Sequence, residues 1–187
     1  MITKTAKSIR KSLVRFLRED DGTASLEFVL VFPVFFTMFL MTVESGLVNA
    51  RHVMLERGVD LTVREIRIGR MAVPNADRVA ERICEIALII PDCAKNLRVE
   101  LLRRNPVSFD PVTTGITCID RSQESQPVLG FTPGTNNDLM VMRVCVRIDP
   151  LLPTTGLGKA IVDGRDEKAD GSYALVTQSA FVVEPFQ

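Results

Sequence analysis

An uncharged apolar run near the N-terminus constrains this chain more than any other feature. Residues 28–43 read FVLVFPVFFTMFLMTV and contain no charged side chain. As a helix, the run would span roughly 24 Å, whereas the hydrocarbon core of a bilayer is about 30 Å thick. Extending the helix back to Thr23 supplies the missing length and brings Glu27 to the membrane boundary. A carboxylate there costs free energy, so the presence of Glu27 needs an explanation.

Three kinds of segment could contain such a run. A cleavable secretory signal peptide needs a small-residue cleavage site, and Val43-Glu44-Ser45 is a poor one. A buried helix of a soluble protein is disfavoured because the run is apolar on every face. A membrane anchor fits best. Pro33 then predicts a kinked rather than a broken helix, since membrane helices tolerate proline.

The charge distribution predicts the orientation of this anchor. The formal net charge is zero, but residues 1–21 are basic on balance and the rest is slightly acidic. Basic segments stay on the cytoplasmic side of a membrane, and such a head on an acidic body argues against nucleic-acid binding. We expect a cytoplasmic leader (1–22), a transmembrane helix (23–48) and a periplasmic domain (49–187) of an inner-membrane protein. The basic residues within positions 1–21 are Lys4, Lys7, Arg10, Lys11, Arg15 and Arg18.

The remainder of the chain predicts an α+β domain. Apolar residues recur every seventh position at Leu47, Met54, Leu61 and Ile68, so one long helix over 24–71 is expected. Asn75 would cap a second helix. The long helix, half in the membrane and half periplasmic, would pack on a small antiparallel sheet. The second helix is expected at 76–90, a short helix near 157–162, and strands at 97–102, 116–119, 139–148 and 173–183.

A short motif surrounds the start of the apolar run. Gly22 ends the charged leader, Glu27-Phe28 follows, Pro33 lies inside the run, and Glu44-Ser45-Gly46 comes at its end. With these residues the chain resembles the pilin-like proteins of tight-adherence (Flp-type) pilus systems, in the TadE/TadG-like group, over about residues 15–70. The final residues 181–186, FVVEPF, also look like the closing strand of that group. The chain is too short for the adhesion-type domain of large members, so it resembles the small TadE-type member.

The resemblance implies a pilin-like fold and a minor pilin or pseudopilin needed for assembly of a type IV pilus. It implies cleavage after Gly22 by a prepilin peptidase, which leaves Thr23 as the new N-terminus. The new ammonium group and Glu27 would lie about one helical turn apart, with Glu27 near the positive end of the helix dipole. In related pilins this glutamate pairs with the N-terminal amine of a neighbouring subunit.

The expected partners are the peptidase, other pilins, proteins of the assembly platform and the inner membrane. A second interpretation stays open, in which Gly22 is a linker residue and Glu27 only reaches the cytoplasmic interface. The uncut protein would then be a single-pass adaptor that links the assembly platform to periplasmic components. Whether the protein enters the filament is also left open.

The cysteines all lie after residue 80, so a periplasmic body exposes them to an oxidising compartment. Four cysteines allow three pairings. We favour Cys84 with Cys93, which closes a short loop where a helix ends, and Cys118 with Cys145, which ties a loop-rich region to the clearest strand. A zinc site is not expected, because there is no C-x-x-C and the single histidine, His52, lies in the long helix.

No pattern of catalytic residues emerges. The serines lack a G-x-S-x-G context. An acidic cluster at Asp163, Asp166, Glu167 and Asp170 does not match the spacing of an EF-hand, so it reads as a solvated loop. We therefore expect no enzyme, no cofactor, no metal, no small-molecule substrate and no nucleic-acid partner.

Overall fold

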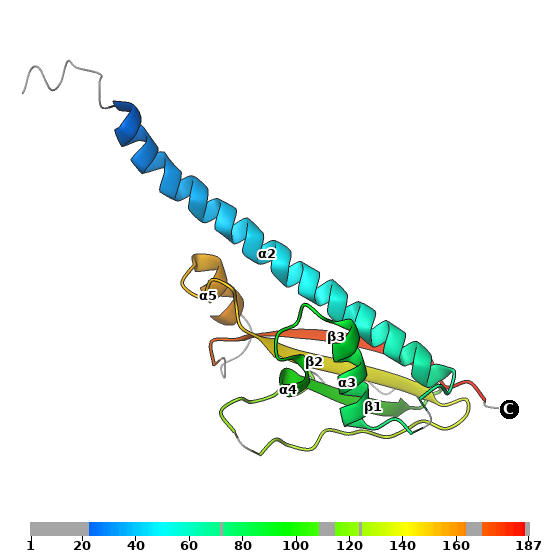
Figure 1. Ribbon diagram of the computed structural model, residues 1–187. Helices are drawn as coiled ribbons and strands as arrows, with labels where there is room; N and C mark the ends of the chain where they lie inside the picture. The colour runs from blue at the N-terminus through cyan, green and yellow to red at the C-terminus, as the bar shows by residue number, and fades with distance from the viewer. Residues whose placement is uncertain (1–22, 72, 109–114, 124, 164–169, 186–187) are drawn as a thin grey trace, which may run out of the picture. The chain divides into compact units, whose positions relative to one another are not determined.

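The computed structural model describes residues 23–71, 73–108, 115–123, 125–163 and 170–185. The chain divides into two compact units, Met1–Thr42 and Val43–Gln187. The long helix α2 (Thr23–Arg67) begins in the first unit and runs without interruption through Pro33. It is drawn from blue to cyan-green in Figure 1. The predicted leader, residues 1–22, lies outside the described residues.

Helix α2 ends at Arg67, earlier than the predicted residue 71. Gly69 has a φ of 70°, a left-handed conformation that glycine adopts without a steric cost. The Gly69 N–H donates to the Ile66 carbonyl at 3.1 Å, and the Arg70 N–H donates to the Glu65 carbonyl at 2.9 Å. These two bonds form a Schellman motif, which satisfies the last carbonyls and turns the chain away from the helix axis.

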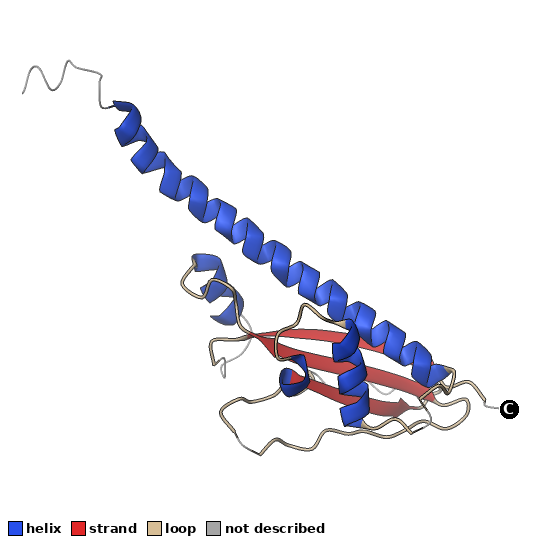
Figure 2. Cartoon of the chain, in the orientation of Figure 1, coloured by secondary structure: helices blue, strands red, loops and turns tan. Residues whose placement is uncertain are grey.

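The second unit contains a three-stranded antiparallel sheet in the order β1-β2-β3 (Figure 2). The predicted fold class, α+β with a long N-terminal helix and a small antiparallel sheet, is confirmed. Three further helices complete the unit. The elements are α3 (Ala76–Ile86), α4 (Cys93–Asn96), β1 (Leu97–Arg104), β2 (Leu139–Ile148), α5 (Gly156–Asp163) and β3 (Tyr173–Val182).

The hydrophobic core joins α2, α3 and the sheet. Its helical members follow the spacing of one helix face, and its strand members alternate, as amphipathic elements require. Asn75 caps α3 as predicted, because its side-chain oxygen accepts the Arg78 N–H at 2.8 Å. The core includes Leu55, Val59, Val63 and Ile66 from α2, Val79 and Ile83 from α3, and Met140, Met142, Val144, Val146 and Ile148 from β2.

The central strand β2 is buried on both faces. The face opposite the core carries Arg143, Cys145 and Arg147, and all three are buried. Arg143 forms an ion pair with Glu100 of β1 at 3.2 Å. The guanidinium of Arg147 donates to the Ser172 hydroxyl at 3.3 Å. Partners of this kind make burial of the charged groups tolerable.

Two predicted elements were wrong in extent or kind. Helix α3 ends at Ile86 rather than residue 90, and a short α4 begins after Asp92, whose φ is 47°. No strand forms at residues 116–119 in the described part of that region. A disulfide holds Cys118 on β2, while Phe131 forms the parallel bridge to Leu101 of β1. Tertiary links of this kind override local strand propensity.

Candidate functional site

The residues of the predicted processing motif lie at the start of α2. Gly22 lies outside the described residues, Thr23 is the first residue of the helix, and the side chains of Glu27 and Phe28 are exposed. The first turn of α2 contains no acidic residue. Glu27 is one turn further along, and the effect of the helix dipole falls off within the first turn. The expected stabilisation of Glu27 by the helix dipole stays a prediction.

The apolar run occupies the first part of α2, and most of its side chains are exposed. Among the described residues, one helix, over Ala24–Arg67, is long and apolar enough to span a membrane, and none of its most apolar window is buried. Phe28, Phe35 and Met38 are each more than 60% exposed. An apolar surface of this length is unfavourable in water, so it indicates a segment that contacts lipid or another apolar surface.

Local contacts within the run suit an apolar environment. The hydroxyls of Thr37 and Thr42 donate to carbonyls one turn earlier, those of Pro33 and Met38. These bonds satisfy polar groups that lipid could not. Phe28, Phe32 and Phe36 stack one turn apart, with ring centroids 4.9 and 5.6 Å apart.

A buried carboxylate follows directly after the run. Glu44 has no exposed surface. Its two oxygens accept the backbone N–H groups of Leu151 and Leu152, each at 2.9 Å. Hydrogen bonds from backbone N–H groups to a carboxylate are charge-assisted and stronger than those between neutral groups. Glu44 therefore joins α2 to the segment between β2 and α5.

A second buried polar contact lies further along α2. The Arg51 guanidinium donates to the Tyr173 hydroxyl at 2.9 Å and to the Asp149 carbonyl at 3.4 Å. Burial raises the pKa of Tyr173, and the hydrogen bond from Arg51 acts in the opposite direction. Arg51 thus ties the helix to the start of β3 and to the residue after β2.

Helix α2 is also paired with α3. The Arg82 guanidinium donates to both oxygens of Glu65, at 3.0 and 2.7 Å. This bidentate contact lowers the pKa of Glu65 and raises the pKa of Arg82. The geometry fixes the relative rotation of two helices that both face the core.

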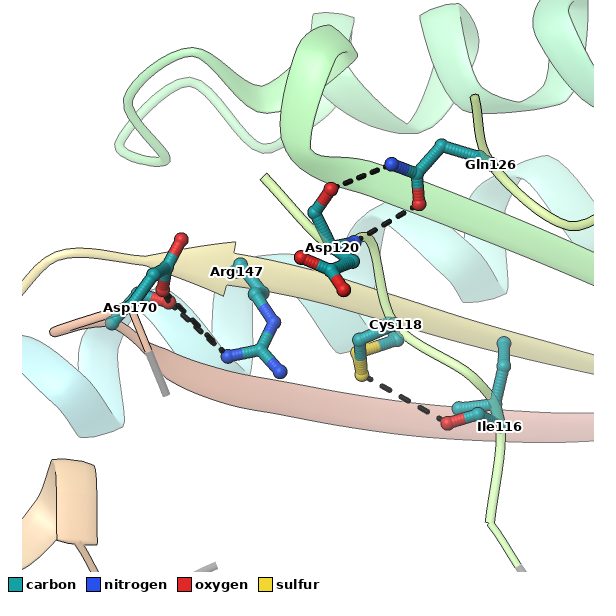
Figure 3. The surroundings of a disulfide bond; sticks show 8 residues. Ile116, Cys118, Asp120, Gln126, Arg147 and Asp170 are labelled. Atoms are coloured by element: carbon teal, nitrogen blue, oxygen red, sulfur yellow. Dashed lines mark hydrogen bonds and ion pairs between the residues drawn. A yellow bond between two sulfur atoms is a disulfide. The ribbon is translucent and has the colours of Figure 1, made fainter. Parts of the chain in front are cut away.

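Two disulfides brace the second unit, in the pairing that the sequence favoured. Cys84 and Cys93 link α3 to α4 with their Cα atoms 5.6 Å apart, and Cys118 and Cys145 link a loop to β2 at 5.4 Å. Figure 3 shows the surroundings of the second bond.

The loop that carries Cys118 has a polar contact of its own. The Gln126 side chain accepts the Asp120 N–H at 3.0 Å and donates to the Asp120 carbonyl at 2.6 Å. On the strand side of the disulfide, Arg147 points toward Asp170 at 3.8 Å (Figure 3). Cys145 and Arg147, on the second face of β2, are both buried.

Other sequence-predicted residues are not brought together into a site. His52 lies on α2, 3.7 Å from Glu56 and 3.4 Å from the Val176 carbonyl. Of the acidic cluster, Asp166 and Glu167 lie outside the described residues. In the part of the chain that the structure describes, no three potential ligands gather as a metal site would need.

Sequence reasoning missed the roles of Glu44, Arg51 and Tyr173. Glu44 stood in the recognised motif but was given no task. A charged residue directly after an apolar run is a weak signal by itself, since helix ends often carry charges. The partners are more than 100 positions away in the sequence, so local pattern could not reveal them.

Comparison with known proteins agrees with the motif. Residues 22–64 match the family model for TadE-like proteins. This range begins at Gly22, covers the apolar run and Glu44, and ends inside α2. No match was found among curated proteins or among solved structures. Over residues 22–64, this chain is similar to TadE-like proteins, a family of pilus assembly proteins.

Proposed function

We propose that this protein is a minor pilin or pseudopilin that takes part in assembly of a tight-adherence (Flp-type) type IV pilus. The observation that carries the proposal is the start of α2, where an exposed and uncharged apolar run lies inside the TadE-like range. The coarser role, participation in pilus assembly, is what the family match supports. The finer role rests on the processing motif.

The proposed protein is a single-pass protein of the inner membrane. Its basic leader stays in the cytoplasm, because positive charges resist translocation. Its body, from the end of the apolar run, is periplasmic. The two disulfides support a periplasmic location of the body, because such bonds persist in oxidising compartments and are rare in the cytosol.

A prepilin peptidase would cut between Gly22 and Thr23. The exposed Glu27 would then be free to pair with the N-terminal amine of a neighbouring subunit, which offsets part of the cost of holding a carboxylate at the membrane. Other pilins and the assembly platform are the further partners. The protein is proposed to act through these contacts, without enzymatic activity or cofactor.

Intact mass spectrometry of the non-reduced protein, purified from membranes with and without the cognate peptidase, tests this function. A loss that matches residues 1–22, only when the peptidase is present, is expected. Two disulfides would lower the mass by four hydrogens. A full-length mass in both strains would refute processing and favour an uncut adaptor between the assembly platform and periplasmic components.

A matched pair of variants tests the proposed pairing of the Glu27 carboxylate with the amine of a neighbouring subunit. Glu27→Gln is expected to leave membrane insertion intact and to reduce the number of pili, because the amine of the neighbour loses its charged partner. Glu56→Gln is the control, since its side chain is 51% exposed on the later part of α2. Normal piliation in the Glu27→Gln strain would refute the proposed pairing.

A further inference from the structure

The loop of residues 150–155, which we call the Leu151 loop, is held at a defined position along α2. Glu44 accepts the N–H groups of Leu151 and Leu152, each at 2.9 Å. Glu44 is also the first residue after the apolar run, which ends at Val43. The loop therefore lies beside the helix position where an apolar, membrane-spanning segment gives way to a charged one.

Several polar groups of this loop have hydrogen-bond partners within it or in the adjoining α5. The Thr155 hydroxyl donates to the Leu152 carbonyl at 2.8 Å and accepts the Gly158 N–H at 3.1 Å. The Thr155 N–H also donates to the Leu152 carbonyl at 3.2 Å. With the two N–H groups on Glu44, these contacts lower the cost of removing the loop from water.

The loop is closely packed against α5. A Cβ at Gly158 would come within 2.3 Å of the Leu152 carbonyl oxygen, so only glycine allows this approach. Such packing holds the loop in one conformation. Leu151 nevertheless projects from it with 54% of its surface exposed.

The composition of this region suits a lipid surface. From Pro150 to Val162 the sequence PLLPTTGLGKAIV contains no acidic residue, and Lys159 is its one basic residue. Lys159 is exposed. One exposed leucine and one exposed lysine in such a segment suit the interface of a bilayer, where apolar side chains enter the acyl boundary and lysine stays with the headgroups.

We propose that the Leu151 loop is a second membrane contact, in which Leu151 enters the outer interface of the bilayer that α2 spans. The inference rests on the proposed anchoring of α2. If the apolar run spans the bilayer, the membrane surface lies near its last residue, and Glu44, which holds the loop, is the next residue. Val128 is 98% exposed and serves as a comparison at another place on the unit.

Tryptophan fluorescence in vesicles tests the proposal, since the chain has no native tryptophan. Three full-length variants, Leu151→Trp, Phe36→Trp and Val128→Trp, are reconstituted in phosphatidylcholine vesicles with bromine on the acyl chains near the headgroup. Bromine quenches only a tryptophan that it can contact. Non-reduced intact mass, which reports both disulfides, checks that each variant has folded.

The expected result is a blue-shifted emission and a loss of fluorescence for Leu151→Trp and Phe36→Trp, with Val128→Trp unquenched. Quenching of Phe36→Trp alone would overturn the loop contact and leave the anchor intact. If Phe36→Trp is also unquenched, the anchor fails, and both the proposed function and this inference are refuted. Equal quenching of Leu151→Trp and Val128→Trp would show non-specific adsorption and would also overturn the proposal.

Discussion

Replacing Glu44 by alanine removes the acceptor that two backbone N–H groups share. Glu44 is fully buried, and its oxygens lie 2.9 Å from the nitrogens of Leu151 and Leu152. Nothing in the alanine side chain can accept these bonds. The substitution should therefore loosen the Leu151 loop without changing the apolar run or the sheet.

The size of the effect follows from the burial of the two donors. A buried donor left without a partner costs about 1–3 kcal/mol. Leu151 is 54% exposed, so water can reach part of this loop, and the lower end of that range applies. The two donors together give about 2–3 kcal/mol. Glu44→Gln keeps one acceptor oxygen and should cost about half as much.

Hydrogen exchange of the full-length protein in vesicles measures this directly. A cost of about 1.4 kcal/mol for each amide corresponds to roughly tenfold faster exchange. Peptides covering residues 149–158 should show this faster amide exchange in Glu44→Ala. The exchange rate should increase less in Glu44→Gln. The control is Glu56→Ala, whose side chain is 51% exposed and lies 3.7 Å from His52. Unchanged exchange in Glu44→Ala would refute the reasoning.

Three further predictions concern the second unit. Replacing Cys118 and Cys145 by alanine should lower the free energy of unfolding by about 2–4 kcal/mol, which denaturant unfolding monitored by circular dichroism would detect, and an unchanged midpoint would contradict it. Burial raises the pKa of Tyr173 above 10.0, so its stabilising contribution is present below pH 10 and is lost as pH rises through the folded pKa. Ultraviolet titration follows this cleanly, because Tyr173 is the single tyrosine, and an ordinary midpoint would argue against its burial. Arg82 lowers the pKa of Glu65 from 4.5, so that contribution is present above pH 4.5 and is lost as pH falls through the folded value. Thermal unfolding of Glu65→Gln should therefore depend less on acid pH than that of the natural sequence, and parallel profiles would contradict the pairing.

Much of the fold could be predicted because its signals are local. The alternation of residues along β2 predicted its bounds, Leu139–Ile148. The residue type at Asn75, a favoured helix cap, predicted the start of α3. The end of α2 was less predictable, since Gly69 either continues a helix at some cost or ends it. The Schellman bonds that decide between these outcomes depend on where the following chain packs.

The candidate site divides in the same way. The apolar run, Glu27 and the family motif are contiguous, so they could be recognised from sequence. The contacts of Glu44 and Arg51 could not, because their partners are brought near only when the sheet forms. The strand predicted at 116–119 was wrong for the same reason, since the bond to Cys145 fixes that segment on a strand face instead of at a sheet edge.

The sequence by itself determined that this chain carries an uncharged apolar helix, because hydrophobicity and charge act residue by residue along a continuous segment. The side of the membrane that the body occupies stays a prediction, drawn from the basic residues near the anchor. Only the tertiary structure decided that both faces of β2 are covered and that Glu44 holds the Leu151 loop. Those features depend on pairs of groups far apart in the chain, whose meeting is set by packing of the whole unit.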